Sequence, residues 1–182
     1  MSGNVFLAVD LSDEERHGLA AVLTDADLSR VVPGKRTRPE NWHITLRFIG
    51  DAEEHQTDRL AERIEALLDA EPGVIHLTAI GGFPKLSKAS VLFLGVEDDY
   101  DILDLVAANC EEATMEAGFE AEDRPFHPHL TVSRIRPPKD LRILESSFDE
   151  IRFPIKVAAV TMFRSESSRD GLRYRPLYRF AL

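Results

Sequence analysis

His43-Ile44-Thr45-Leu46 and His129-Leu130-Thr131-Val132 are two copies of one phrase, a histidine and a threonine that alternate with apolar residues. Alternation of this kind is typical of a β-strand, in which successive side chains point to opposite faces. We therefore predict that His43, Thr45 and Arg47 share one face of a strand. In the second copy, His127, His129 and Thr131 share a face.

The position of each motif in a longer repeat distinguishes these two copies from chance occurrences of histidine and threonine at this spacing. His55 and His76 are also followed two residues later by threonine, so the phrase alone is a weak signal. His43, however, stands 38 residues after the apolar strand that opens at Val5, and His129 stands 38 residues after a similar strand at Val91. Such a repeat indicates an internal duplication. We predict that His43 and His129 are equivalent, that His55 lies on a solvated helix and that His76 lies on an ordinary strand.

Each half of the chain predicts the same order of elements, strand, helix, motif strand, helix, strand. The first helices begin with acidic residues, which suit the positive end of the helix dipole. The predicted elements are helices that begin near 12–15 and 98–101, second helices over 54–69 and 138–147, and third strands over 75–83 and 155–163. We predict one domain over 1–182, with repeats of approximately 1–86 and 87–182.

The composition favours a cytoplasmic protein with a good core. No apolar run is long enough to span a bilayer, and the amino terminus lacks a basic region followed by an apolar segment. The single cysteine, Cys110, falls among apolar residues of a predicted helix, so we expect it to pack rather than react. One unpaired cysteine is consistent with a reducing compartment.

Charge is distributed unevenly along a chain whose net charge is −10. Residues 31–50 hold four basic residues, Lys35, Arg36, Arg38 and Arg47, against one acidic residue. Residues 124–142 hold five, Arg124, Arg134, Arg136, Lys139 and Arg142, against Asp140. Positive charge around both motifs favours a local anion site over an extended surface that follows phosphates.

With these residues in view, the chain resembles the 2H phosphoesterases, and most closely the RNA 2′,3′-cyclic phosphodiesterases, also called 2′-5′ RNA ligases. The resemblance covers most of the chain and rests on the segments 5–10, 38–50, 81–84 and 125–134. It implies an α+β fold of two pseudo-symmetric lobes, each an antiparallel sheet backed by helices. A central cleft between the lobes would carry both HxTx motifs.

The resemblance also implies roles for the motif residues. His43 would be the proton donor and His129 the proton acceptor, while Thr45 and Thr131 would hold the phosphate. Two departures stand beside the motifs, because relatives often have leucine where Trp42 stands and arginine where His127 stands. We expect Trp42 to pack in the core, on the face opposite His43.

Three further residues are candidates for binding the phosphate. His127 shares the predicted face of His129, and Arg47 shares that of His43. Strict alternation puts Arg134 on the face opposite His129, so it would need a bulge or a strand end to reach the cleft. Phe83 and Phe163, at equivalent strand ends, would stack a base or belong to the core.

The predicted reaction is metal-independent hydrolysis of an RNA 2′,3′-cyclic phosphate end to a 2′-phosphomonoester. One imidazole removes a proton from water and the other gives a proton to the departing ribose oxygen. The reverse reaction would join a 5′-hydroxyl to the cyclic phosphate in a 2′-5′ link. The reaction implies no nucleotide cofactor, and the chain has no GxxxxGK[ST] phosphate loop. We expect an RNA partner, no membrane, no protein partner and, by default, a monomer.

Three alternatives remain open. A metal-dependent phosphohydrolase would use His43, His127 and His129 as zinc ligands, although neither motif face carries an acidic residue. A small cyclic nucleotide or ADP-ribose cyclic phosphate would be a different substrate for the same chemistry. A nucleotide- or RNA-binding module of the same fold would have lost turnover.

Overall fold

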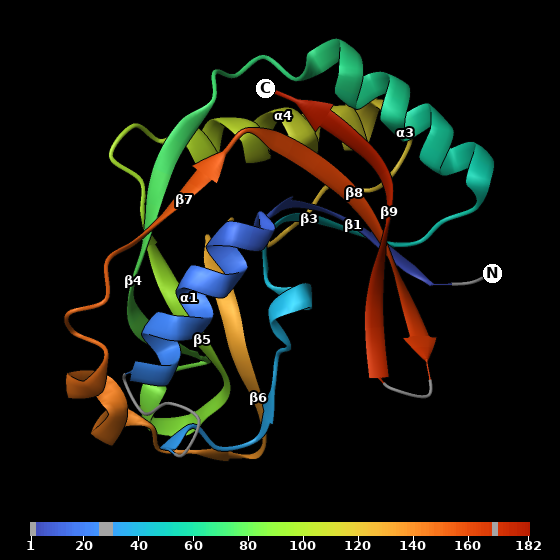
Figure 1. Cartoon of the computed structure of the whole chain (residues 1–182). Helices are drawn as coiled ribbons and strands as arrows, with labels where there is room; N and C mark the ends of the chain where they lie inside the picture. Colours follow the sequence, from blue (N-terminus) through green and yellow to red (C-terminus); the bar gives the residue numbers. More distant parts are fainter. Residues whose placement is uncertain (1–2, 26–30, 169–170) are drawn as a thin grey trace.

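A computed structural model describes residues 3–25, 31–168 and 171–182 of the chain. Within these ranges nine strands form one curled antiparallel sheet (Figure 1). Its order is β7-β4-β5-β6-β3-β1-β8-β9, and the short β2 also pairs with β6. The strands are β1 (Asn4–Asp10), β2 (Lys35–Arg36), β3 (His43–Asp51), β4 (Gly73–Phe83), β5 (Ala89–Glu97), β6 (His129–Lys139), β7 (Phe153–Val157), β8 (Ala159–Ser168) and β9 (Gly171–Ala181).

Two lobes meet in the middle of this sheet. One contains β7, β4, β5 and β6, and the other contains β3, β1, β8 and β9. Each lobe draws strands from both halves of the chain, because β4 pairs with β5 and β8 pairs with β1. The predicted α+β fold with two pseudo-symmetric lobes is therefore confirmed. The third strand of each half of the chain, β4 or β8, joins the lobe that contains the motif strand of the other half.

Helices cover the sheet of each lobe. The α-helices of the described residues are α1 (Asp13–Asp25), α3 (Glu54–Leu67) and α4 (Ile102–Glu116). Helix α1 lies across the lobe that holds β5, while α3 and α4 lie side by side over the other lobe (Figure 1). Their apolar faces are closed to solvent, as Leu19, Leu60 and Val106 show by having no exposed surface. Burial of these faces stabilises helices that would be marginal alone.

The second half of the chain departs from two predictions. The helix predicted over 138–147 is wrong, because β6 extends to Lys139 and only a 3-10 helix, η3 (Arg142–Ser147), follows. Pro137 and Pro138 lack the N–H groups that a helix needs, and the N–H of Leu141 instead donates to the carbonyl of Leu86. Residues 155–163 form two strands rather than one, interrupted at residue 158, so that β7 and β8 join different lobes.

Two shorter turns complete the fold, η1 (Pro39–Asn41) just before the first motif and η2 (Leu86–Lys88) after β4. The last strand, β9, was not among the predicted elements; it forms a long hairpin with β8. Among the described residues, no helix is both long and apolar enough to cross a membrane.

Candidate active site

The two motifs lie next to each other at the junction of the lobes. Ile44 of β3 pairs with Leu130 of β6, and this is the one residue pair that joins these strands in the described structure. In an antiparallel ladder the flanking positions are then His43 opposite Thr131, and Thr45 opposite His129. Each histidine therefore stands beside the threonine of the other motif.

The same local contact fixes both imidazole rings. Nδ1 of His43 lies 2.8 Å from the carbonyl oxygen of Asn41, and Nδ1 of His129 lies 2.7 Å from the carbonyl oxygen of His127. A carbonyl oxygen only accepts, so Nδ1 of each ring carries the proton and donates it. In both rings Nε2 is left as the nitrogen that gains or loses a proton.

Nε2 of His43 already has a partner in the free protein, since it lies 3.0 Å from Oγ1 of Thr45. When His43 is neutral, Nε2 has only a lone pair, so the Thr45 hydroxyl donates to it. This contact brings histidine and threonine of one motif to a common point, as their shared strand face predicts.

Aromatic rings surround each histidine. The His43 ring lies 5.0 Å from that of Phe6 and 5.1 Å from that of Tyr174, centre to centre. The His129 ring lies 4.9 Å from that of Phe83 and 5.2 Å from that of Phe93. These rings displace water from the imidazoles and hold their orientation.

Burial away from water favours the neutral form of both histidines and lowers the pKa of each. Burial lowers the pKa of His43 from 6.5 to about 4, and the nearby charges of His129 and Arg134 act in the same direction. The Nδ1 hydrogen bond to Asn41 opposes this shift. Burial also lowers the pKa of His129, again with Arg134 contributing. In the free protein at neutral pH both rings are therefore neutral.

Arg47 does not share the face of His43, and the prediction that it does is wrong. A bulge interrupts the β1–β3 ladder, since Ala8 pairs with Thr45 while Leu7 pairs with Arg47. The extra residue turns the Arg47 side chain away from His43 and toward α4, where it is only 9% exposed.

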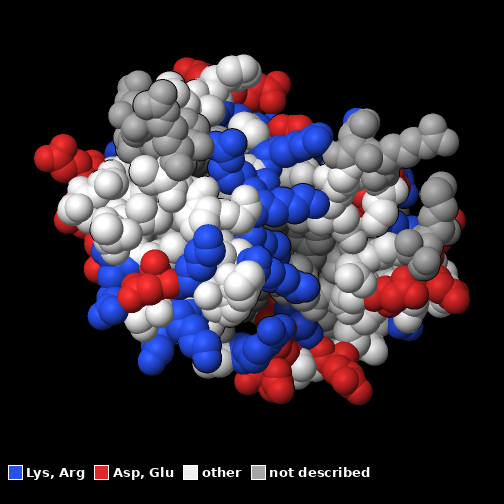
Figure 2. Space-filling model, turned by 90° about the horizontal axis from the view of Figure 1, so that it is seen from below, with Lys and Arg blue, Asp and Glu red and all other residues white. Residues whose placement is uncertain are grey.

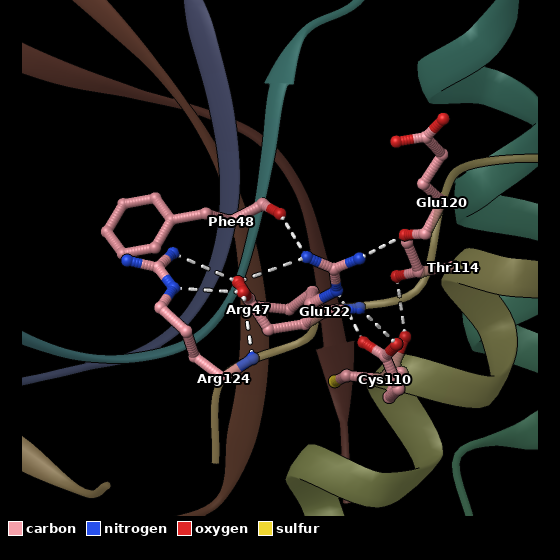
Figure 3. A network of polar contacts seen from close by, with 8 residues as sticks. Arg47, Phe48, Cys110, Thr114, Glu120, Glu122 and Arg124 are labelled. Carbon is pink, nitrogen blue, oxygen red and sulfur yellow. Dashed lines mark hydrogen bonds and ion pairs between the residues drawn. The ribbon is translucent and has the colours of Figure 1, made fainter. Parts of the chain in front are cut away.

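A polar network holds Arg47 there (Figure 3). Its Nε lies 2.5 Å from Oε2 of Glu111 on α4, and its other nitrogens donate to the carbonyls of Phe48 and Glu120. Glu122, 3.5 Å from Arg47, also accepts bonds from Arg124. The predicted phosphate ligand is instead a link between β3, α4 and the segment that leads to the second motif.

The matching bulge in β6 has the opposite consequence for Arg134. Phe93 pairs with Thr131 whereas Leu92 pairs with Ser133, so Val132 is the extra residue. Ser133 turns into the core with no exposed surface, and Arg134 turns outward on the face of Thr131 and His129. Its charge acts on both catalytic candidates, because it lowers the pKa of His43 and of His129.

The two bulges make the cleft asymmetric. Phe48 occupies in the first motif the place that Arg134 occupies in the second. Phe48 is 52% exposed, and its ring lies 6.0 Å from that of Phe6, which contacts His43. At this equivalent position the first motif therefore carries an aromatic ring and the second a cation.

The remaining candidates divide between the site and the core. His127 is exposed, with its ring 6.2 Å from that of His129 and beside Phe83. Trp42 is buried, as expected. Phe163 is also buried, stacked on Phe6 at 5.5 Å.

The other two histidines with a following threonine lie apart from the motifs. On α3, Nδ1 of the exposed His55 lies 3.2 Å from Oε2 of Glu53, and on β4, His76 stands opposite Glu97 of β5.

Sequence reasoning missed three residues that contact the histidines, Phe6, Phe93 and Tyr174. Phe6 and Phe93 lie in continuous apolar runs, in which no alternation identifies the face of a residue. Tyr174 lies in residues 172–180, where alternation with arginine is the signal that indicates a strand. Among the described residues, no group of three or more histidine, cysteine, aspartate and glutamate side chains is arranged to hold a metal ion.

The chain is similar to known proteins over most of its length. Residues 29–169 match the model of the 2′-5′ RNA ligase superfamily. An RNA 2′,3′-cyclic phosphodiesterase of Aeropyrum pernix is 32% identical over 165 residues, which cover 88% of this chain and 93% of that protein. The protein of the same name from Methanothermobacter thermautotrophicus is 31% identical, with both chains covered completely.

Solved structures show the same fold. LigT of E. coli, solved in complex with 3′-AMP, superposes with a TM-score of 0.78 at 24% identity and covers 100% of this chain and 99% of its own. TT0787 of Thermus thermophilus superposes with a TM-score of 0.76 at 25% identity and covers 98% of this chain and 97% of its own. From the family model and these relatives, we conclude that the chain belongs to the 2′-5′ RNA ligase superfamily.

Proposed function

We propose that this protein is an RNA 2′,3′-cyclic phosphodiesterase that works by paired-histidine acid–base catalysis without a metal ion. The observation that carries the proposal is the pairing of Ile44 with Leu130, which makes the two histidine–threonine motifs neighbours across β3 and β6. The names of the relatives from Aeropyrum pernix and Methanothermobacter thermautotrophicus supply the substrate class.

In the proposed reaction His129 is the base. Its Nε2 takes a proton from water as the water oxygen attacks the phosphorus. The bond from phosphorus to the ribose 3′ oxygen breaks, and His43 Nε2 gives that oxygen its proton. The product is a 2′-phosphomonoester. The pair holds one proton throughout, on His43 before the reaction and on His129 after it. Hydroxyls of Thr45 and Thr131 donate to the non-bridging oxygens, where negative charge increases in the transition state.

The lowered pKa of His129 supports its role as the base, whereas His43 depends on the substrate for its proton. A neutral His129 is ready to accept a proton at pH 7. His43, with a pKa of about 4 in the free protein, has to gain a proton before it acts as an acid. A phosphodiester anion bound beside the ring favours the charged imidazolium and so raises that pKa. Substrate binding thus supplies the proton donor.

The same groups can join two RNA ends. When a 5′-hydroxyl takes the place of water, His129 removes its proton and His43 again protonates the departing ribose 3′ oxygen. A 5′-hydroxyl that attacks the cyclic phosphate gives a 2′-5′ link. Water outcompetes such a hydroxyl by concentration, so hydrolysis is the main direction.

Turnover of a nucleoside 2′,3′-cyclic phosphate in EDTA tests the proposal. We expect the wild type to give the 2′-phosphate, and His43→Ala and His129→Ala each to lose about 10²–10⁴ in rate. His76→Ala is the matched control and should stay active. Activity only with added metal would favour the zinc alternative, and stoichiometric binding without product would favour a binding module.

A further inference from the structure

The cations of this acidic protein gather where three segments of the sheet meet. Residues 31–39, 73–96 and 124–139 hold nine of the 22 lysines and arginines and none of the 32 aspartates and glutamates. The segments are neighbours, because β2 pairs with β6 and β6 pairs with β5. Charges that are separate in sequence are thereby brought to one end of the molecule.

Figure 2 views that end and shows lysines and arginines in a band beside the central hollow, with acidic side chains mainly at the margins. We define the basic strip as Lys35, Arg134, Arg136 and Lys139, all of which are exposed. Among the described residues, none of these four forms an ion pair with a carboxylate, whereas Arg47, Arg124 and Arg142 do. Unpaired exposed cations are available to an anionic partner.

The strip begins at the histidines. The β6 bulge turns Arg134 onto the face of His129 and Thr131, and Lys35 pairs directly with Arg134, so their side chains share that face. Ile135 is buried and Arg136 exposed, so Arg136 follows Arg134 on the same side. His129 pairs with Gly95 and Lys139 with Ala89, six residues of β5 apart, so at about 3.3 Å per residue the strip extends roughly 20 Å from His129, beyond the site of a terminal phosphate.

We propose that the basic strip binds the phosphates of an RNA strand on the 5′ side of its cyclic end, so that the preferred substrate is a single-stranded oligonucleotide rather than a mononucleotide. The inference rests on the proposed function, which places the cyclic phosphate at His43 and His129. A row of unpaired cations leading away from that point has the charge and direction that a chain of phosphodiesters requires. A small cyclic nucleotide would leave Lys35, Arg136 and Lys139 unused.

The test compares two substrates, cytidine 2′,3′-cyclic phosphate and a short single-stranded oligoribonucleotide with the same cyclic end. The variant carries Lys35→Gln, Arg136→Gln and Lys139→Gln. Its matched control carries Arg59→Gln, Lys156→Gln and Arg179→Gln, three exposed cations outside the strip. Both variants change the net charge equally, so any difference between them is local.

We expect the strip variant to lose about tenfold or more in kcat/KM on the oligoribonucleotide, and to keep the wild-type value on the mononucleotide. The control should keep both. For three phosphate contacts on a single strand, the wild-type log kcat/KM should fall with log salt with a slope of about −2, and the strip variant should lose this slope.

Equal losses in the strip variant and the control would overturn the proposal, as would a wild type that shows no preference for the oligoribonucleotide. Failure of the proposed function itself would look different, because the wild type would turn over neither substrate. In that case, binding of the labelled oligoribonucleotide, measured by fluorescence anisotropy, would still test whether the basic strip holds RNA. Equal affinity of the strip variant and the wild type would refute the RNA-binding role of the strip.

Discussion

Ile44 and Leu130, the second residues of the two motifs, pair with each other across β3 and β6, and neither side chain is exposed to solvent. This pair is the point about which the two lobes are related. It also sets the spacing of the catalytic candidates, because each residue is flanked by a histidine and a threonine. Packing at the junction and chemistry in the cleft therefore depend on the same two residues.

Truncation at the junction should affect activity as well as stability. We expect Ile44→Ala and Leu130→Ala each to lower the free energy of unfolding by about 2–4 kcal/mol, measured by chemical denaturation. A relaxed junction misplaces the histidines, so kcat should fall more than KM rises. Ile155→Ala, fully buried in β7 at the end of the sheet farthest along this lobe from the junction, is the control for stability alone. Equal effects of all three substitutions on kcat would contradict a special role for the pair.

Arg47 should prove structural. Arg47→Met removes one partner of a largely buried ion pair and leaves Glu111 without its cation, so we expect a loss of about 3 kcal/mol in stability. Arg63→Met breaks an exposed pair with Glu116, also on α4, and should cost less than about 1 kcal/mol. A stable Arg47→Met with a raised KM would instead return Arg47 to the phosphate site.

Arg134 should set the pH profile of the reaction. Its charge lowers the pKa of His43 and of His129, so Arg134→Gln should raise both values. The limbs of the kcat/KM profile, which report the free enzyme, then move to higher pH. The KM for a nucleoside cyclic phosphate should rise as well. Arg179→Gln, on β9, is the control; a profile unchanged in Arg134→Gln would place Arg134 outside the site.

Burial of neutral His43 should make the fold sensitive to acid. The pKa of His43 falls from 6.5 to about 4 on folding, so between these values the unfolded chain binds a proton that the folded chain lacks. Stability is full above pH 6.5 and decreases as the pH falls toward 4, by about 3 kcal/mol for this group. Thermal unfolding between pH 7 and pH 4.5 measures the effect. His43→Gln should show a flatter dependence of Tm on pH, and an equally steep one would refute the assignment.

The parts of the site that the sequence predicted follow from strict alternation. His43 with Thr45, and His129 with Thr131, lie before the bulges, where period two holds. Arg47 and Arg134 lie after the bulges, so their faces are exchanged relative to the prediction. A bulge leaves little signal in one sequence, because each extra residue, Leu46 or Val132, is as apolar as its neighbours.

Longer-range features could not be predicted from the sequence because they depend on which strands pair in the folded chain. Nothing in the apolar run 155–163 indicates that its two ends join different lobes, since pairing is decided by which open edges are available. Tyr174 approaches His43 only because β9 folds back on β8. The basic strip likewise exists only once β2 pairs with β6, and the sequence pattern alone favoured a local anion site.

The exchange of third strands limits how the chain can be divided. A fragment that ends after β4 would carry the first motif with an open edge at β1, where β8 belongs, and an unpaired β4. Two copies of such a fragment, related by a twofold axis, could fill each other's edges and set two histidines face to face. The single chain thus has the strand arrangement that a strand-swapped homodimer of two such fragments would have. Within one polypeptide the two motif strands need not be identical, and the equivalent positions here hold Phe48 and Arg134.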